Sequence, residues 1–343
     1  MTVKTTKLGG TASGVVVGRV AHGLMTMHLY ALRMSELSDD VCFASIKAGV
    51  DRLPAGTKMF LNSGDFYSIT RGTQNIEMLG RFYAKYPEYA DKTFLSVKGA
   101  TTATLEPDAS MEGMRRSMDR IEAALGTHKK MDLFQPARVD PKMTIEEIMA
   151  NLLVLQKEGH FTHIGLSECS AATLRKAHAI HPITAAEIEV SLTSYEPETK
   201  KVIEAARELG ISVLGYSPVG RSLLTGTVTK VSDLPENDFR RHLARFKEGA
   251  LEHNLNVVSV LPKIAGEKGV TQAQVAIAWV ASLGDHVIPL PGSSNPERTV
   301  ENCSAGDVEL SADELKVLNE IAEANNVVGE RYFGGPEEKF LWG

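Results

Sequence analysis

The chain has 343 residues, 43% of them hydrophobic and 23% charged, with a formal net charge of −6. This balance is typical of a globular protein that buries its own core. No basic run or tail stands out, so nucleic acid is not an expected partner. No uninterrupted apolar run approaches about 18 residues, so the sequence predicts no membrane-spanning segment.

Eight short apolar runs alternate with longer amphipathic stretches, in this order: Arg19–Leu24, Lys58–Asn62, Thr93–Lys98, Asp132–Gln135, Thr162–Leu166, Ala186–Val190, Ser212–Tyr216 and Val287–Leu290. Nearly continuous hydrophobicity is typical of parallel strands buried on both faces. Eight strand–helix units with no shift in composition predict a (β/α)8 TIM barrel in the α/β class, with residues 1–343 as one domain.

The helical stretches have recognisable ends. Thr144 and Glu147 form a capping box, and Gly159 stands where that helix should end. Thr271 with Gln274 and Ser311 with Glu314 have the same spacing. Pro197 suits the first turn of a helix that ends before Gly210.

Two segments exceed the repeat. One is a polar connection from Arg221 to about Leu251, and the other is a tail after Asn325 that includes Gly334, Gly335, Pro336 and Trp342. Long connections after barrel strands lie on the face that carries the chemistry. We therefore expect the loop to act as a lid and the tail to lie over the barrel mouth. A mobile surface excursion is the alternative for the loop.

Several common motifs are missing. Gly9, Gly10 and Gly14 precede the first strand and are interpreted as turn residues, so no Gly-x-Gly-x-x-Gly dinucleotide motif is present. His160 and His163 lack further ligands at metal-site spacing, and we expect no metal. The three cysteines, Cys42, Cys169 and Cys303, are few and far apart, and residues 1–8 contain no apolar signal segment. These features predict a cytoplasmic protein with free thiols.

Three strand ends carry polar residues where a barrel places its active site. They are Asn62-Ser63-Gly64-Asp65-Phe66-Tyr67, then Lys98-Gly99, and then the run from Tyr216 to Gly226. With the later run from Gly292 to Arg298 and with Glu301-Asn302, these segments resemble the aldo-keto reductases in order and over nearly the whole chain. Within that family, Asn62, Ala137 and the run from Asp132 to Asp140 are most similar to the fungal pyridoxal reductases.

The resemblance implies reduction of a small aldehyde by NADPH, and specifically of pyridoxal to pyridoxine. Tyr67 would be the proton donor, and Lys98 would lower the pKa of its phenol. The family usually has Asp where this chain has Asn62, and His where it has Ala137. Because Asn is uncharged, Lys98 is expected to be less neutralised than in relatives. Ala137 should enlarge a substrate pocket that Phe66 also lines; Met27, Tyr332 and Phe333 are weaker candidates for its wall.

The cofactor contacts implied by the resemblance follow the same order along the chain. Those near the nicotinamide are Met25, Thr26, Ser167, Glu168, Glu187 and Tyr216, where Glu168 and Glu187 replace the usual Asn and Gln. Those around the pyrophosphate are Ser217, Pro218, Val219, Gly220, Arg221, Leu223 and Gly226. Those at the adenosine end are Gly292, Ser293, Ser294, Arg298, Glu301 and Asn302, with Arg298 on the 2′-phosphate.

Three alternatives stay open. The substrate could be another aldehyde or ketone, because loops shape the pocket. The chain could be a cofactor-binding regulatory subunit, as in the potassium-channel β subunits of the same family, because two catalytic positions are altered. A barrel isomerase or aldolase would need a Schiff-base lysine or a phosphate loop. No amphipathic stretch demands a protein partner, so a monomer is expected.

Overall fold

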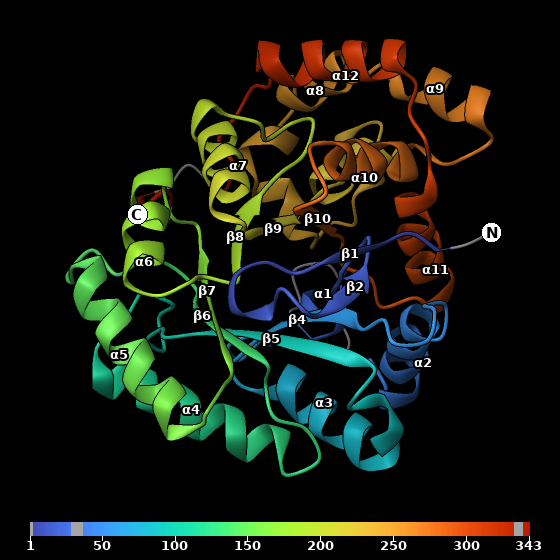
Figure 1. Ribbon diagram of the computed structural model, residues 1–343. Helices are drawn as coiled ribbons and strands as arrows, with labels where there is room; N and C mark the ends of the chain where they lie inside the picture. The colour runs from blue at the N-terminus through green and yellow to red at the C-terminus, as the bar shows by residue number, and fades with distance from the viewer. Residues whose placement is uncertain (1–2, 29–36, 333–338) are drawn as a thin grey trace.

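The structure is a computed structural model that describes residues 3–28, 37–332 and 339–343. Eight parallel strands pair in the order β10-β9-β8-β7-β6-β5-β4-β3. They are β3 (His22–Gly23), β4 (Met59–Gly64), β5 (Thr93–Gly99), β6 (Leu133–Pro136), β7 (His163–Ser167), β8 (Ala185–Glu189), β9 (Ser212–Tyr216) and β10 (Val287–Leu290). The sheet closes into a barrel where the N–H groups of Ala21 and Gly23 donate to Pro289 and Pro291. This confirms the predicted TIM barrel (Figure 1).

Helices surround the barrel (Figure 1). The α-helices are α1 (Met25–His28), α2 (Asp39–Val50), α3 (Gln74–Lys85), α4 (Met111–Leu125), α5 (Ile145–Glu158), α6 (Ala171–Ile180), α7 (Pro197–Leu209), α8 (Ala250–Val257), α9 (Leu261–Lys268), α10 (Gln272–Ser282), α11 (Pro296–Ser304) and α12 (Ala312–Ala324). The capping boxes predicted before α5, α10 and α12 are all present. Gly159 and Gly210 end α5 and α7 in the left-handed conformation.

Alternate residues of each strand point into the barrel and form layers. One layer is apolar and includes Phe60, Phe94, Leu133, Leu214 and Ile288, in a cluster separate from the main core between strands and helices. Two residues further along, β4, β5, β6 and β9 carry Asn62, Ser96, Gln135 and Tyr216, whereas β10 keeps the apolar Leu290. The site therefore begins one layer above an apolar floor.

An N-terminal hairpin, β1 (Thr5–Lys7) and β2 (Val16–Gly18), covers this floor and was not predicted. Leu8 and Val17 pack against the apolar layer. The hairpin lies in front of the barrel in Figure 1. Gly10 has a φ of 50° and lies directly against Ile183, so the turn it was predicted to make needs glycine.

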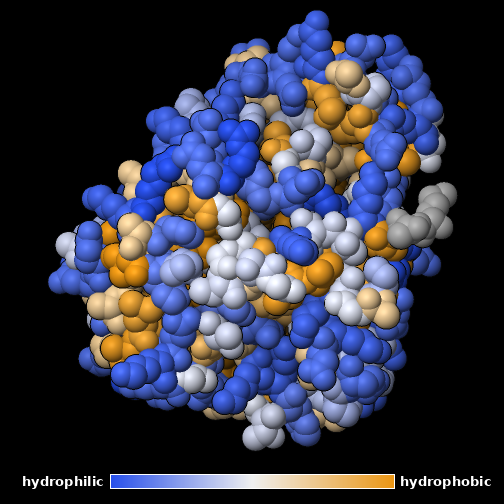
Figure 2. Space-filling model, in the orientation of Figure 1, coloured by the Kyte–Doolittle hydropathy of each residue, from blue (hydrophilic) through white to orange (hydrophobic). Residues whose placement is uncertain are grey.

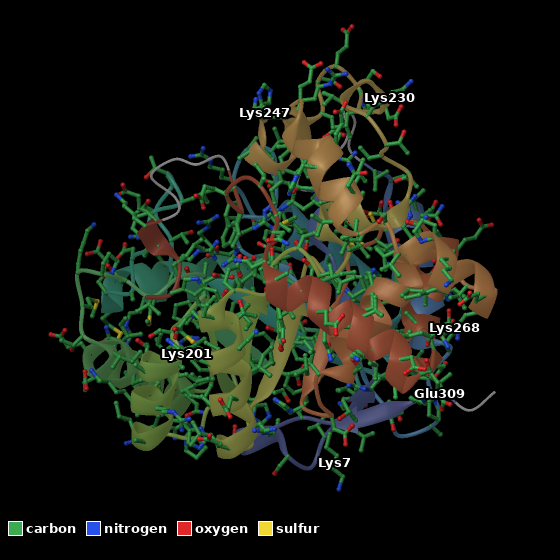
Figure 3. The ribbon with its side chains drawn as sticks, turned by 90° about the horizontal axis from the view of Figure 1, so that it is seen from above. Lys7, Lys201, Lys230, Lys247, Lys268 and Glu309 are labelled. Atoms are coloured by element: carbon green, nitrogen blue, oxygen red, sulfur yellow. The ribbon has the colours of Figure 1, made fainter. Side chains whose placement is uncertain are left out.

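The long connection and the tail lie at the opposite end of the molecule. Figure 3 shows Lys230 and Lys247 of the connection at one end and Lys7 of β1 at the other. The connection contains the 3-10 helices η3 (Gly220–Thr225), η4 (Val231–Asp233), η5 (Phe239–His242) and η6 (Ala244–Phe246). In the remainder of the chain, η1 (Gly10–Ala12), η2 (Pro87–Tyr89) and η7 (Ala305–Asp307) are also 3-10 helices.

The first barrel strand is shorter than predicted. Only His22–Gly23 pairs as β3, instead of Arg19–Leu24. Arg19 uses its guanidinium to hold backbone carbonyls near β10, including that of Val287 at 2.5 Å. Its apolar neighbours made the run resemble a longer strand.

The outer surface is mostly hydrophilic on the face seen in Figure 2, with hydrophobic side chains in smaller groups between. Within the described ranges, no helix has the length and apolarity that a membrane crossing requires. All three cysteines are buried and free, as predicted.

Candidate active site

Four polar side chains from different strands meet inside the barrel. Lys98 of β5 places Nζ 2.6 Å from Oε1 of Glu187 on β8 and 2.5 Å from Oδ1 of Asn62 on β4. Asn62 donates to Oε2 of Glu187 at 2.6 Å, and Gln135 of β6 donates to the same oxygen at 2.6 Å. All four residues are at most 5% exposed, so charge here must be neutralised within the protein.

Glu187 corrects the expectation that Lys98 is poorly neutralised. Burial, the largest single effect, lowers the pKa of Lys98, but Glu187 and Tyr67 together outweigh it, so the net shift is upward. Lys98 is therefore a charged ammonium paired with a carboxylate from β8. The prediction failed because the sequence shows that Asn62 is uncharged but not that Glu187 lies across the barrel.

Tyr67 follows β4 in a turn, and its side chain returns over the strand end. The ring is 6% exposed, and Lys98 Nζ lies 5.2 Å from its centroid. Burial raises the pKa of Tyr67, Lys98 lowers it, Glu187 raises it again, and the net shift is upward. Lys98 thus lowers the pKa of the phenol as expected, but burial outweighs this effect and the phenol stays protonated near neutral pH. A protonated, buried phenol is suited to give a proton rather than to take one.

Phe66 and Ala137 flank this group. Phe66 is half-buried and packs edge-on against the Tyr67 ring, with centroids 5.2 Å apart. Ala137 follows β6 and is 3% exposed; its carbonyl accepts a hydrogen bond from Arg138 at 2.6 Å. Among the other expected wall residues, Met27 belongs to the main core, and Phe333 lies outside the described residues.

A second polar cluster lies at the barrel mouth. Arg331 of the tail binds Glu168 through two hydrogen bonds, of 2.8 and 3.2 Å, and Glu189 at 3.1 Å. Tyr216 donates to Glu168 at 2.7 Å, and its hydroxyl lies 2.8 Å from that of Tyr332. Two residues that the resemblance assigned to the nicotinamide, Glu168 and Tyr216, are therefore tied to the tail.

The pyrophosphate candidates form a tightly turned loop after β9. Ser217, Gly220, Arg221 and Ser222 all have left-handed φ angles, between 53° and 80°. The Arg221 guanidinium lies 3.3 Å from Glu189 and also donates to the carbonyl of Arg331. The remaining candidates of this group lie on the same loop, namely Pro218, Val219, Leu223 and Gly226. Arg221 is thus part of the mouth cluster in this structure.

The adenosine-end candidates lie after β10 and on α11. Arg298 is exposed, and the described part of the chain provides no ion pair to its guanidinium. Ser293 is held near the barrel because His22 donates from Nε2 to its carbonyl at 3.0 Å. Asn302 is 6% exposed, and Glu301 accepts a hydrogen bond from Thr271. A free guanidinium beside this helix start is suitable for a phosphate monoester.

Thr26 offers a second sign of fit to a dinucleotide. Its hydroxyl is buried yet has no hydrogen-bond partner among residues 3–28, 37–332 and 339–343. A Cβ added at Gly292 would lie 3.4 Å from Thr26 Cγ2, so Thr26 adjoins Gly292 and with it the adenosine-end segment. Met25 is 38% exposed, and Ser167 is buried at the end of β7. An unpaired buried hydroxyl is a group that a polar ligand could satisfy.

A model of the aldo/keto reductase family matches residues 33–323. The chain belongs to the aldo/keto reductase family. Aldo-keto reductases use NADP(H) and reduce carbonyl compounds. The exposed Arg298 guanidinium and the unpaired Thr26 hydroxyl fit such a cofactor.

Curated relatives agree with this assignment. The chain is 34% identical to a probable pyridoxal reductase 2 of Schizosaccharomyces pombe, over 80% of this aldo-keto reductase and 84% of the relative. It is 36% identical to the aldo-keto reductase str7 of Strobilurus tenacellus, over 74% and 76%. It is 31% identical to the NADP(+) aldo-keto reductase yakc of Schizosaccharomyces pombe, over 99% and 98%.

Solved structures show the same fold. A glycerol dehydrogenase from Gluconobacter oxydans superposes with a TM-score of 0.79 at 21% identity, over 95% of this aldo-keto reductase and 97% of that chain. A thermostable aldo-keto reductase solved with the inhibitor epalrestat gives 0.69 at 19% identity, over 93% and 99%.

Sequence reasoning missed Gln135 and Arg331 as parts of the site. Gln135 is a polar residue at an inward position of an apolar strand, and that pattern could have marked it. Arg331 lies 163 residues from Glu168 in a tail without regular structure, and no local signal links the two.

Proposed function

We propose that this aldo-keto reductase reduces an aldehyde to an alcohol with NADPH, that its substrate is pyridoxal, and that Tyr67 is the proton donor. The observation that carries the proposal is the buried, protonated phenol of Tyr67 beside the charged ammonium of Lys98. The similarity to a probable pyridoxal reductase supports the choice of substrate.

Each group of the proposed site has its own role in the reaction. Bound NADPH supplies the hydride that the carbonyl carbon accepts. Tyr67 gives its phenolic proton to the carbonyl oxygen, and Lys98 stabilises the phenolate left behind. Arg298, with Ser293 and Ser294, holds the 2′-phosphate of the cofactor. The loop from Ser217 to Gly226 would hold the pyrophosphate, and Arg221, which now pairs with Glu189, would supply a guanidinium to its oxygens.

The choice of a planar substrate rests on Ala137. A methyl group stands where the family usually has an imidazole, so no side-chain donor orients the carbonyl there. We assign the freed space to the ring of a planar aldehyde. The Phe66 ring, which packs against Tyr67, would then contact the ring of the substrate.

The test follows NADPH absorbance with purified protein and pyridoxal, beside a panel of generic aldehydes. We expect turnover on pyridoxal that falls by about 10²-fold or more in Tyr67→Phe, with NADPH binding retained. Turnover on the generic aldehydes alone would support carbonyl reduction but rule out pyridoxal as the substrate. Tight NADPH binding without turnover would instead favour a cofactor-binding regulatory protein.

A further inference from the structure

The cation and the anion of the inner cluster come from strands that are three positions apart in the sheet. Lys98 lies on β5 and Glu187 on β8, with β6 and β7 between them in the sheet. Their side chains are 6% and 4% exposed, and Nζ lies 2.6 Å from Oε1. Within the described ranges, Glu187 is the carboxylate that forms an ion pair with Lys98.

The Glu187 carboxylate is fixed at both oxygens. Oε1 accepts from Lys98, and Oε2 accepts from Asn62 and from Gln135, each at 2.6 Å. Gly165 of β7 leaves room for Gln135, because a Cβ there would lie 3.0 Å from its Oε1 and 3.1 Å from the carbonyl of Ala185. The orientation of Glu187 therefore depends on hydrogen bonds from three other strands, β4, β5 and β6.

Asn62 suits this arrangement because an amide both donates and accepts. Its Nδ2 donates to Glu187 while its Oδ1 accepts from Lys98. A carboxylate at position 62 could accept from Lys98 but would face the Glu187 carboxylate as a like charge. The two positions are complementary. A neutral amide at position 62 goes with an anion at position 187, and an anion at position 62 would go with a neutral amide at position 187.

We propose that Glu187 is a positioning residue that supplies the anionic partner of Lys98 from β8, in place of an acid at position 62, and so holds Lys98 beside Tyr67. The inference rests on the proposed role of Tyr67 as proton donor. It replaces the expectation that Glu187 contacts the nicotinamide carboxamide, because both of its oxygens are already engaged inside the barrel.

The inference predicts rescue by exchanging the two groups. We would compare Glu187→Gln, Asn62→Asp and the double variant, with the exposed Glu320→Gln on α12 as a matched control. Each single variant should lower kcat, Glu187→Gln by about 10²-fold. The double variant has one acid and one amide again, and it should recover to within about tenfold of the wild type.

A second readout needs neither cofactor nor turnover. In protein labelled with [13Cζ]tyrosine, the Tyr67 signal, assigned with Tyr67→Phe, reports the pKa of its phenol. Among the described residues, the titratable groups with the largest effect on Tyr67 are Lys98, Glu187 and Tyr332. Glu187→Gln should lower this pKa, because the pull of Lys98 is no longer offset by an anion. The alkaline limb of the reduction rate should shift to lower pH in parallel, and the double variant should reverse both changes.

The outcomes separate the inference from the proposed function. If Glu187→Gln keeps kcat and only weakens NADPH binding, Glu187 is a cofactor contact and the inference is wrong. If the double variant is folded but its kcat is no higher than that of the single variants, an acid at position 62 cannot replace Glu187, and the inference is again wrong. If the wild type reduces no carbonyl, the proposed function fails, and the NMR titration of the cofactor-free protein still decides the pairing.

Discussion

Arg331 in the C-terminal tail and Glu168 at the end of β7 form a buried, two-point ion pair, although 163 residues separate them. Arg331 also reaches Glu189 at the end of β8. The tail is therefore fastened to the strand ends that bear the site, and Arg331 together with Arg221 balances two buried carboxylates.

Replacing Arg331 should destabilise the protein. Arg331→Met leaves Glu168 and Glu189 buried with less neutralisation, and removing one partner of a buried pair costs about 3–5 kcal/mol. Urea unfolding should show this loss, whereas Arg207→Met at the exposed end of α7 should change stability by less than about 0.5 kcal/mol. An unchanged midpoint for Arg331→Met would mean that the tail does not depend on this pair.

Arg298 should determine the preference for NADPH over NADH. Its exposed guanidinium is free for a phosphate within the described structure, and a charge-assisted hydrogen bond contributes about 1.5–3 kcal/mol. Arg298→Ala should weaken NADPH binding by about 10- to 100-fold and leave NADH binding nearly unchanged. Fluorescence titration with both cofactors measures this, with Arg175→Ala on α6 as the control. Equal losses for both cofactors would count against a 2′-phosphate contact.

Ala137→His should separate substrates by shape. The imidazole would fill space that we assign to the pyridine ring, so kcat/KM for pyridoxal should fall by about tenfold or more. Small aliphatic aldehydes should keep their rates or gain from the new donor. Steady-state kinetics on both classes checks this, with Ala137→Ser as a smaller replacement. Full activity of Ala137→His on pyridoxal would contradict the role given to Ala137.

Acid should lower the free energy of unfolding through protonation of His22. Burial lowers the pKa of His22 to about 4 from 6.5, although its hydrogen bond to Ser293 acts in the other direction. Because the unfolded chain binds the proton more readily, the stabilisation is present above pH 6.5 and is lost as the pH falls toward 4. The loss amounts to about 3 kcal/mol.

Unfolding measured between pH 7 and 4 in wild type and His22→Asn isolates this contribution. The wild type should lose more stability over this range than the variant does. Parallel pH curves for the two proteins would assign the acid sensitivity to other groups.

Strand positions could be predicted because buried parallel strands leave a clear apolar pattern. The predictions for Ser212–Tyr216 and Val287–Leu290 match β9 and β10 residue for residue. The hairpin of β1 and β2 was missed because each strand has only three residues, too few for a periodic pattern. Helix starts were predictable because a capping box such as Thr144 with Glu147 is a local signal.

The sequence could predict which residues belong to the site, but not which of them form ion pairs with one another. Resemblance assigned Tyr67 and Lys98 to the reaction and Glu187 to the nicotinamide, and the structure brings all three side chains together. It could not show that Glu187 reaches Lys98 instead of facing outward to a ligand, because this depends on the stagger of strands across a closed barrel. The same limit hid the contact between Arg331 and Glu168.

The last residues of the chain carry a practical consequence. Gly343 donates its N–H to the carbonyl of Glu168, and its own carbonyl accepts from Ser170. A purification tag joined after Gly343 would have to leave from beside Glu168 and would disturb the rim of the site. A tag placed before β1 would project from the other end of the barrel, so the N-terminus is the place to attach the protein to a resin, a dye or a sensor surface.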